Sequence, residues 1–393
     1  MAEKRGIASA PVHARRVLVR VDFNVPLDAN GRIADDRRIQ EAMPTLNHLR
    51  ASGARTILMS HLGRPDGKRD PRFSLRPVAH HLSGILGQPV SFAEDIVGSR
   101  PLELATKLQN GQFLMLENLR FHPGEEANDP AFATQLANLG QVFIEDAFGT
   151  VHRAHASTVG VPQRLPSFAG LLVEREVREL SKLVEAPERP YVVLVGGAKV
   201  ADKLPFLTSF LGRADSLLIG GALAFPFLHA QNARLGATPV EGGLTEGVTA
   251  FFERAKQAGT EVVLPSDVVV ERAGTTEVTA HAVGHLPPGA VARDIGPDTR
   301  ARFADVLSRS RTVFWNGPLG LAEDARFALG TKEVLTRLGE TAGYHVAAGG
   351  DSARVALDLG VARSFQFIST GGGAALEFVQ GLELPGLAVL PDA

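Results

Sequence analysis

The sequence contains no cysteine, which excludes disulfides, thiolate catalysis and cysteine-based zinc sites. It also lacks the two common nucleotide-binding motifs: GxxxxGK[ST] is absent, and no expected strand is followed by GxGxxG. The most apolar stretch, 216–230, is too short to span a bilayer and is interrupted by Gly220-Gly221. The basic N-terminal residues have no apolar segment beside them, so we expect no secretory signal and a cytoplasmic protein.

Neither sign of charge is in excess. The chain has 41 Lys and Arg against 43 Asp and Glu, a formal net charge of −2, which gives no support to a nucleic-acid partner. Residues 1–170 hold 20 Lys and Arg against 17 Asp and Glu, and 8 of the 12 histidines, which fits an anionic ligand in that half. A length of 393 residues exceeds one ordinary core and favours two domains.

Short β-branched segments alternate with segments of helical period along the chain. The expected strands cover residues 17–22, 56–60, 113–117, 141–146, 191–195, 215–219, 261–264, 312–315, 344–348 and 365–369. The expected helices cover residues 36–51, 129–139, 174–185, 201–211, 246–258, 299–309 and 352–359. This alternation favours parallel sheets flanked by helices, and ten strands are too many for one such sheet. We therefore expect two α/β domains with a seam in 160–190, where one amphipathic helix connects them.

Arginine and histidine follow four successive strands of the first half, and Arg38 opens the first helix. These residues, with the polar pair after the first strand, are Asp22, Asn24, His61, Arg64, Arg120, His122, His152, Arg153 and His155. The carboxyl ends of parallel strands meet at one sheet edge, so these side chains should gather there. Each alone suits an ordinary surface charge or packed histidine, but together the guanidinium groups suit a small polyanion.

The polar residues of the first strand have different expected roles. Asp22 and Asn24 would bind a hydroxyl group or orient the arginines, because a carboxylate facing the anion would repel it. Arg20 lies deeper in the strand, and we expect it to pair with a buried acid in a structural role. A metal site is the alternative for His152 and His155, but no HExxH or carboxylate partner accompanies them.

Glycine-rich turns follow the strands of the second half. They contain Gly196-Gly197, Gly220-Gly221, Gly296, Gly349-Gly350 and Gly371-Gly372-Gly373. Such turns let backbone N–H groups approach a phosphate, although glycine also simply punctuates α/β turns. Only 8 lysines stand against 33 arginines, yet Lys199 and Lys203 lie four residues apart just after one of these turns. Asp351 is the best Mg²⁺ candidate, and a helix N-cap is its alternative role.

Eight ordered motifs give the chain a close resemblance to the phosphoglycerate kinase family over essentially its whole length. They are RVLVRVDFNVPL (16–27), SHLGRP (60–65), ENLRFHPGEE (117–126), DAFGTVHRAHAST (146–158), GGAKVADK (196–203), WNGPLG (315–320), GGDS (349–352) and STGGGA (369–374). The resemblance implies an ATP:3-phosphoglycerate phosphotransferase of glycolysis and gluconeogenesis, with two Rossmann-like three-layer domains joined by a helical hinge. It also implies a monomer whose partners are 3-phosphoglycerate or 1,3-bisphosphoglycerate and Mg-ATP or Mg-ADP, without nucleic acid or membrane.

The resemblance implies domain bounds of 1–170 plus 376–393 for the 3-phosphoglycerate domain, 171–187 for the hinge helix and 188–375 for the nucleotide domain. The implied 3-phosphoglycerate residues are Asp22, Phe23, Asn24, Arg38, His61, Leu62, Gly63, Arg64, Arg120 and Arg153. The implied nucleotide residues are Gly197, Ala198, Lys199, Lys203, Gly220, Gly221, Gly296, Asn316, Pro318, Glu323, Gly349, Gly350, Asp351 and Ser352. Glu323 would contact the ribose hydroxyls, and Asp351 would hold the metal.

The expected chemistry needs no general base, because the carboxylate of glycerate is already ionised. Arg38, Lys199, Lys203 and the N–H groups of Gly371, Gly372 and Gly373 would surround the transferred phosphoryl group. Closure of the domains would bring the substrates in line and exclude water.

Departures from the family pattern are few: Ala222 and Leu223 near the adenine, Glu145 for a common Asn, and Ala375 for a common Ser. Two other classes remain as alternatives. A NAD-dependent dehydrogenase is opposed by the missing GxGxxG motif, and a non-catalytic two-lobed binding protein leaves the lysine–glycine site unexplained.

Overall fold

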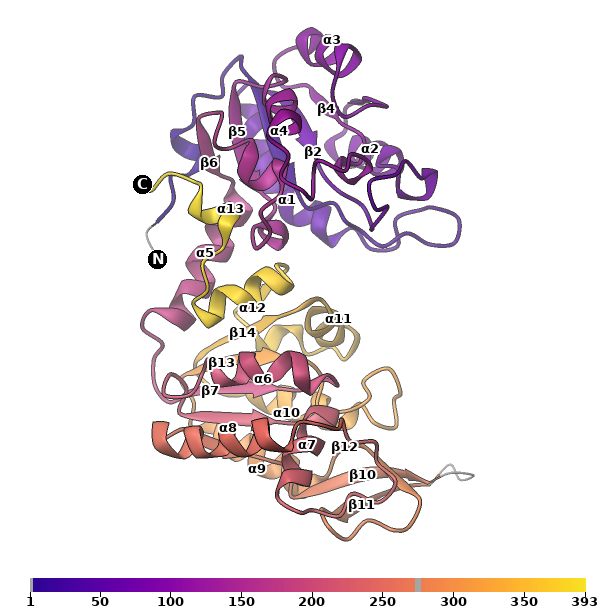
Figure 1. The fold of residues 1–393 in the computed structure, drawn as a ribbon, viewed down its shortest axis with the longest axis vertical. Coiled ribbons are helices and arrows are strands. Elements are labelled where there is room, and N and C mark those ends of the chain that lie inside the picture. The colour runs from indigo at the N-terminus through magenta and orange to yellow at the C-terminus, as the bar shows by residue number, and fades with distance from the viewer. Residues whose placement is uncertain (1–2, 273–276) are drawn as a thin grey trace. The chain divides into compact units, whose positions relative to one another are not determined.

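The structure is a computed structural model that describes residues 3–272 and 277–393. The chain divides into two compact units, Met1–Glu179 with Gly381–Ala393, and Leu180–Gln380 (Figure 1). Helix α5 (Leu171–Val184) begins in unit 1 and ends in unit 2. No helix of the described residues has both the length and the apolar character that a membrane span requires.

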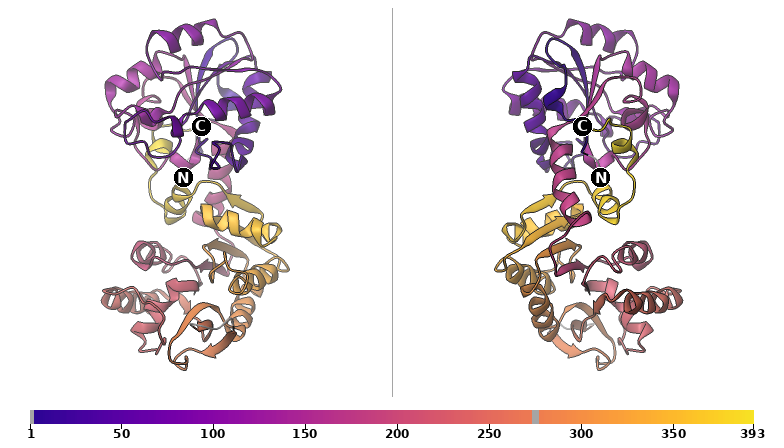
Figure 2. Two further views of the ribbon diagram at one scale, coloured as in Figure 1. Left: turned by 90° about the vertical axis from the view of Figure 1, so that its right-hand side faces the viewer. Right: turned by 90° about the vertical axis from the view of Figure 1, so that its left-hand side faces the viewer.

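Unit 1 is built around a six-stranded parallel sheet of order β3-β4-β2-β1-β5-β6. Its strands are β1 (Arg16–Val21), β2 (Arg55–Met59), β3 (Val90–Phe92), β4 (Phe113–Met115), β5 (Val142–Asp146) and β6 (Ser167–Ala169). Its helices are α1 (Arg37–Ala51), α2 (Arg76–Leu86), α3 (Ser99–Lys107), α4 (Pro130–Ala137) and α13 (Pro385–Ala388). The helices flank the sheet in both views of Figure 2.

Strand β1 lies in the middle of this sheet, paired in parallel with β2 and β5. Both of its faces are covered, which explains why Val17, Leu18, Val19 and Val21 are fully buried without alternation. Local capping fixes the surrounding helices. In α4, for example, the Asp129 side chain accepts a hydrogen bond from Phe132 N at 2.7 Å.

Unit 2 repeats this architecture with a six-stranded parallel sheet of order β15-β14-β13-β7-β8-β9. Its strands are β7 (Tyr191–Val195), β8 (Ser216–Ile219), β9 (Glu261–Val263), β13 (Thr312–Asn316), β14 (Tyr344–Ala348) and β15 (Phe367–Ser369). Its helices are α6 (Val200–Thr208), α7 (Ala224–Ala230), α8 (Thr245–Ala258), α9 (Pro297–Ser308), α10 (Leu329–Leu338), α11 (Gly350–Asp358) and α12 (Gly373–Gln380).

Unit 2 also carries a three-stranded antiparallel sheet that the sequence did not predict. It has the order β11-β10-β12 and consists of β10 (Asp267–Arg272), β11 (Val278–Ala282) and β12 (Ala290–Ile295). The predicted fold class is confirmed: two parallel sheets are flanked by helices, and all ten predicted strands are present. The short strands β3 and β6 and the helices α2, α3, α7, α10, α12 and α13 were not among the predicted elements.

The C-terminal segment belongs to unit 1, where several contacts hold it. Gly386 N donates to the Val151 carbonyl oxygen at 2.8 Å, and Ala393 N to that of Glu3 at 2.8 Å. Lys4 Nζ pairs with Asp392 at 2.7 Å.

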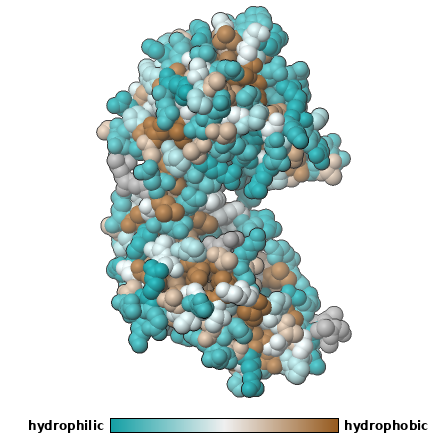
Figure 3. Space-filling model, in the orientation of Figure 1, coloured by the Kyte–Doolittle hydropathy of each residue, from teal (hydrophilic) through white to brown (hydrophobic). Residues whose placement is uncertain are grey.

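The face of the molecule drawn in Figure 3 is largely hydrophilic, with apolar residues interspersed.

Candidate active site

Unit 1 brings the predicted polar residues to the carboxyl ends of β1, β2, β4 and β5, which are neighbours in the sheet. Arg38 Nη1, at the start of α1, donates to Asp22 Oδ2 at 2.7 Å. Gly63 N donates to Asn24 Oδ1 at 2.9 Å, and Arg120 Nη1 donates to the Gly63 carbonyl oxygen at 2.8 Å. The Asp22–Arg38 hydrogen bond is the contact that the orienting role of Asp22 requires, one of the two roles considered from the sequence.

The remaining cations of this edge differ in exposure. Arg64 is exposed, and the Arg38 side chain retains 34% of its accessible surface. Arg153 is half-buried, and its Nε donates to His152 Nε2 at 3.2 Å. Arg120 is buried, with Nε 3.0 Å from Glu126 Oε1 but without hydrogen-bond geometry. Guanidinium groups from several strand ends can thus bind a small polyanion from more than one side.

Arg20 interacts with a buried acid, Glu125, as expected, but through the hydroxyl group of Ser157. Arg20 is 1% exposed and donates from Nε to Ser157 Oγ at 2.9 Å. Ser157 Oγ in turn donates to Glu125 Oε1 at 2.5 Å, so a hydroxyl group stands between the guanidinium and the acid. Arg20 Nη2 also lies 3.1 Å from His61 Nδ1. Sequence reasoning missed Glu125 and Ser157, because both lie more than a hundred positions from Arg20 in the chain.

The two apolar residues among those predicted to bind 3-phosphoglycerate have buried side chains. Phe23 is fully buried and Leu62 is 3% exposed, and both belong to the hydrophobic core of unit 1. Phe23 N donates to Ser60 Oγ at 2.9 Å. A ligand can therefore reach these two residues only through backbone groups.

Three histidines of the cluster, His61, His152 and His155, are held neutral. Burial, assisted by Arg20 and Arg120, lowers the pKa of His61 well below its usual value. Burial and the same arginines lower the pKa of His155 to about 4, and burial with Arg153 lowers the pKa of His152. Positive charge in this cluster therefore comes from the arginines at neutral pH, while the imidazoles supply hydrogen-bonding groups.

In unit 2 the turns after β7, β8 and β13 pack backbone against backbone. A Cβ atom on Gly196 would lie 2.0 Å from the Pro318 carbonyl oxygen, and one on Gly317 2.5 Å from that of Gly196. Gly197 N donates to the Pro318 carbonyl oxygen at 2.9 Å, and Gly221, at φ +64°, approaches the same oxygen. These glycines allow the three strand ends to meet.

Lys203 lies at the centre of this edge. Its Nζ hydrogen-bonds with Asn316 Oδ1, and Asn316 Nδ2 donates to the Ala348 carbonyl oxygen at 2.7 Å. Burial lowers the pKa of Lys203 to about 8, and the Asp351 carboxylate opposes that shift. Lys199 occupies the N-cap position of α6 and is exposed, as is the adjacent Ala198.

The start of α11 has an open side and a closed side. Gly349 has φ +104°, and a Cβ atom there would lie 2.6 Å from Asn316 Nδ2. Ser352 is buried, and its Oγ accepts from Gly317 N at 2.8 Å. A Cβ atom on Gly350 would meet nothing within 4 Å, and the Asp351 side chain is 86% exposed.

The fit of Asp351 to Mg²⁺ follows from its exposure. No group of three His, Asp or Glu residues in the described part of the chain could hold a metal ion on its own. A single exposed carboxylate beside a phosphate site does suit Mg²⁺, which is typically bound through one or two carboxylates plus nucleotide phosphates. The donor set therefore fits a metal that arrives with a nucleotide.

Other predicted nucleotide residues lie on the loops around this edge. Glu323 is exposed, 3.5 Å from Arg354 Nη2, which is also 3.6 Å from Asp351. Sequence reasoning missed Arg354, which carries no motif of its own. Leu223 is fully buried and Ala222 exposed, so only Ala222 presents a side chain to a ligand.

The remaining predicted glycines divide between closed and open surroundings. Gly220 and Gly296 have no room for a Cβ atom, which would lie 2.8 Å from Leu319 Cδ2 and 2.1 Å from Asp267 Oδ2. Gly371 N donates to Ser369 Oγ at 3.1 Å. Gly372, at φ +54°, has nothing within 4 Å of its Cβ position, and Gly373, which begins α12, is exposed.

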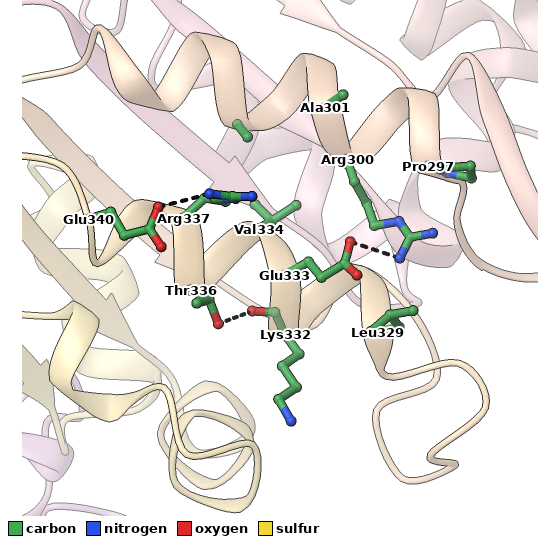
Figure 4. Close-up of a pocket in the computed structure, with 11 residues that line it drawn as sticks. Pro297, Arg300, Ala301, Leu329, Lys332, Glu333, Val334, Thr336, Arg337 and Glu340 are labelled. Atoms are coloured by element: carbon green, nitrogen blue, oxygen red, sulfur yellow. Dashed lines mark hydrogen bonds and ion pairs between the residues drawn. The ribbon is translucent and has the colours of Figure 1, made fainter.

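A separate groove of about 760 Å³ lies along α9 and α10 (Figure 4). Ion pairs Arg300–Glu333, at 2.9 Å, and Arg337–Glu340, at 3.1 Å, line it. None of the predicted site residues lines this groove.

The fold and the two strand edges define a two-unit α/β phosphotransferase, with an arginine cluster in one unit and a lysine–glycine site in the other. The model of the family described as "Phosphoglycerate kinase" matches residues 7–382. The chain belongs to the phosphoglycerate kinase family.

Curated relatives and solved structures agree over nearly the full chain. Phosphoglycerate kinase from Coprothermobacter proteolyticus is 46% identical over 387 residues, 98% of each chain, and that from Herpetosiphon aurantiacus is 45% identical over 391 residues, 99% of each. The structure resembles those of phosphoglycerate kinase from Coxiella burnetii (TM-score 0.89, 34% identity) and Pyrococcus horikoshii (TM-score 0.86, 31% identity), with 98% of each chain covered.

Proposed function

We propose that this phosphoglycerate kinase moves a phosphoryl group reversibly between the acyl phosphate of 1,3-bisphosphoglycerate and ADP, with the glycerate bound by unit 1 and the nucleotide by unit 2. The observation that carries this division is the contrast between the two strand edges. One presents arginines with Asp22 holding Arg38, and the other presents Lys203 beside Asn316 and the open start of α11.

The arginines of unit 1 would bind the glycerate phosphate and carboxylate. Arg64, which is exposed, and Arg153, which is half-buried, would bind the phosphate, while Arg38 is oriented by Asp22. Asn24 orients the Gly63 backbone, which positions Arg120. His61 is kept neutral by burial, and its Nδ1 accepts a hydrogen bond from Arg20 Nη2, so its Nε2–H can donate to a substrate oxygen without adding charge.

The residues of unit 2 would bind the nucleotide phosphates. Lys203 and Lys199 supply positive charge, and the N-termini of α11 and α12 supply backbone N–H groups from Gly350 and Gly372–Gly373. Ser352 and Asn316 hold the Gly317 and Ala348 backbone in place. Glu323 would bind the ribose. Mg²⁺, held by Asp351, would neutralise phosphate charge when bound.

The transfer needs no general base, because the attacking carboxylate is ionised at neutral pH. The catalytic contribution is the positioning of the reacting oxygens and the neutralisation of a metaphosphate-like group by Arg38, Lys199, Lys203 and the glycine N–H groups. Because the substrates bind on separate units, hinge motion of the linking segments would bring them together. The enzyme would act as a monomer in the cytoplasm.

Substitution of one cation from each unit tests the division of labour. We expect Arg38→Ala and Lys203→Ala each to reduce kcat by about 10²–10³, the loss typical of one charge-stabilising donor. In equilibrium titrations, Lys203→Ala should weaken MgADP binding and leave 3-phosphoglycerate binding unchanged.

A coupled assay with 3-phosphoglycerate, MgATP and the purified parent protein sets the reference for both variants. Absence of turnover in the parent would contradict the proposed reaction. Near-normal kcat in either variant would remove that residue from the catalytic group.

A further inference from the structure

A carboxylate from outside the helix closes the start of α6. Val200 N donates to Glu241 Oε2 at 2.8 Å, and Ala201 N lies 3.3 Å from Glu241 Oε1. The N-cap residue itself, Lys199, makes no side-chain capping bond. The first amides of a helix have no hydrogen-bond partner within it, and they form the positive end of the helix dipole. The Glu241 carboxylate accepts hydrogen bonds from these amides, and its negative charge interacts favourably with the dipole.

Glu241 lies in the loop between α7 and α8, and this loop is anchored on β12. Ala237 N donates to the Ala290 carbonyl oxygen at 2.9 Å, and Ala292 N donates to Thr238 Oγ1 at 2.9 Å. The segment from Pro239 to Gly243 is mostly exposed. The anchored residues therefore stand three and four positions before Glu241, and its carboxylate joins the loop to α6.

The first turn of α6 is held at two points. Glu241 binds its backbone amides, and the Lys203 side chain reaches Asn316. Loss of the first contact would leave the turn free to fray, and Lys203 lies in that turn. The start of α11 differs, because its N-cap residue is Gly349, which has no side chain to cap it, and the Cβ position of Gly350 is open.

We propose that Glu241 is a positioning residue for phosphoryl transfer: it fixes the first turn of α6 so that Lys203 faces the nucleotide phosphates. This inference rests on the proposed nucleotide site around Lys203. Because the first α6 amides are bonded to Glu241, α6 contributes its lysines to the proposed site while α11 contributes amides.

The test uses Glu241→Ala and Glu241→Gln in the full chain, with Glu246→Gln as the matched control. Glu246 is an exposed glutamate in the first turn of α8, close in sequence to Glu241. Calorimetric titration with MgADP measures Kd, steady-state assays measure KM for each substrate, and thermal unfolding measures Tm. We expect Glu241→Ala to raise Kd for MgADP about fivefold, the size typical of a lost helix cap.

The variants separate positioning from a general loss of structure. Glu241→Gln keeps one acceptor oxygen and should raise Kd about twofold, less than the Ala variant. KM for 3-phosphoglycerate should stay unchanged in both, and Glu246→Gln should match the parent. If Glu241→Ala does not fold, the Gln variant carries the same comparison, because it is nearly isosteric.

Two results would overturn the inference. Tighter MgADP binding by Glu241→Ala would make Glu241 a competitor of the phosphates, and a lowered Tm with unchanged Kd would make it a purely structural cap. Lys203→Ala tested beside them identifies a different failure. If that variant binds MgADP normally, the proposed nucleotide site itself is wrong.

Discussion

Lys203 is a half-buried cation whose charge state should be visible in the kinetics. Its pKa is lowered to about 8, mainly by burial. A lysine is charged below its pKa, so the proposed phosphate-binding charge is present at neutral pH and lost as pH rises through about 8. We expect kcat/KM for the nucleotide to fall across that range, because this ratio reports groups of the free enzyme. A pH series that brackets about 8, at constant ionic strength, measures the fall.

Lys203→Arg provides the control for this pH dependence. A guanidinium group stays charged throughout the accessible range, so the alkaline decline should disappear even if the variant is slower. A decline that persists in Lys203→Arg would assign it to another group.

Glu145 is a fully buried acid of β5, and its burial has a cost at neutral pH. Burial raises its pKa to about 8 against the opposing effect of Arg20. Its Oε1 accepts from Ala147 N at 2.9 Å, while Oε2 has no hydrogen-bond partner. In the unfolded chain the group ionises near 4.5, so the folded state binds the extra proton between 4.5 and about 8. The stability that this group contributes is complete below 4.5 and is lost as pH rises through that window.

Glu145→Gln should therefore stabilise the protein, and increasingly so as pH rises from about 5 to about 8. We expect a gain on the order of 1–3 kcal/mol at the upper end, measured by urea unfolding at each pH. The control is Glu117→Gln, since both oxygens of buried Glu117 accept hydrogen bonds, from Ser74 Oγ at 2.7 Å and Leu75 N at 2.9 Å. That variant should lose stability. A stability gain in Glu145→Gln that shrinks with rising pH would contradict the assignment.

At the scale of helices and strands, several helix starts are closed by acids from elsewhere in the chain. Asp146 accepts from Leu172 N in α5 at 3.0 Å, and Asp267 accepts from Thr299 N in α9 at 2.7 Å. Asp294 accepts from Gly330 N in α10 at 2.7 Å. Each acid excludes a Cβ atom from a glycine beside it, at 2.2 Å for Gly170 and Gly330 and 2.1 Å for Gly296. The carboxylate takes the place where a side chain would otherwise stand.

This packing explains which part of the site could be predicted from the sequence. A glycine at the start of a helix indicates backbone close to another group, but it does not say whether that group is a ligand or a side chain. Gly296 has a structural reason in Asp267, whereas Gly350 and Gly372 face open space. Likewise, Arg20 is evident as a polar residue in a buried strand, but Ser157 and Glu125 become its neighbours only when distant segments pack.

The same distinction, between what the local sequence shows and what distant packing decides, applies to the strands and helices. Strands such as β1 and β7 are runs of buried β-branched residues, so the sequence alone identifies them. Strands β3 and β6 have three residues each and lie at sheet edges, where pairing with one neighbour decides their conformation. Helix α12 begins at the last residue of the triple glycine. Glycine has a weak helix propensity, which is why the sequence did not predict this helix.

The same substitution should have opposite effects at two glycines. Gly196→Ala would place a methyl group 2.0 Å from the backbone oxygen of Pro318, and backbone cannot move aside cheaply. We expect a loss of stability of about 1–3 kcal/mol or more, and weaker MgADP binding. Gly84→Ala lies within α2 with nothing within 4 Å, so it should gain about 0.5–1 kcal/mol. Urea unfolding of both variants measures the contrast, and similar effects in both would refute the close packing of the turns.

At the scale of the whole molecule, the single tryptophan reports on one unit. Trp315 is fully buried in unit 2, stacks on Phe365 at 5.3 Å and donates from Nε1 to the Gly317 carbonyl oxygen at 2.7 Å. A ligand that binds only the folded state stabilises the part that holds it, by about 2.7 kcal/mol at a concentration 100 times Kd. We expect MgADP to raise the urea midpoint of tryptophan fluorescence more than 3-phosphoglycerate does. Equal shifts at matched saturation would mean that the units unfold as one.

The placement of residues 381–393 has a consequence for biosynthesis. They follow the whole of unit 2 in the chain, yet they pack in unit 1, where Gly386 meets Val151 and Asp392 meets Lys4. A ribosome that has released residues 1–179 has therefore not yet supplied all of unit 1, whereas unit 2 is continuous. During translation, unit 1 is made first but stays incomplete until residues 381–393 are synthesised. Until then it is exposed to proteases and chaperones.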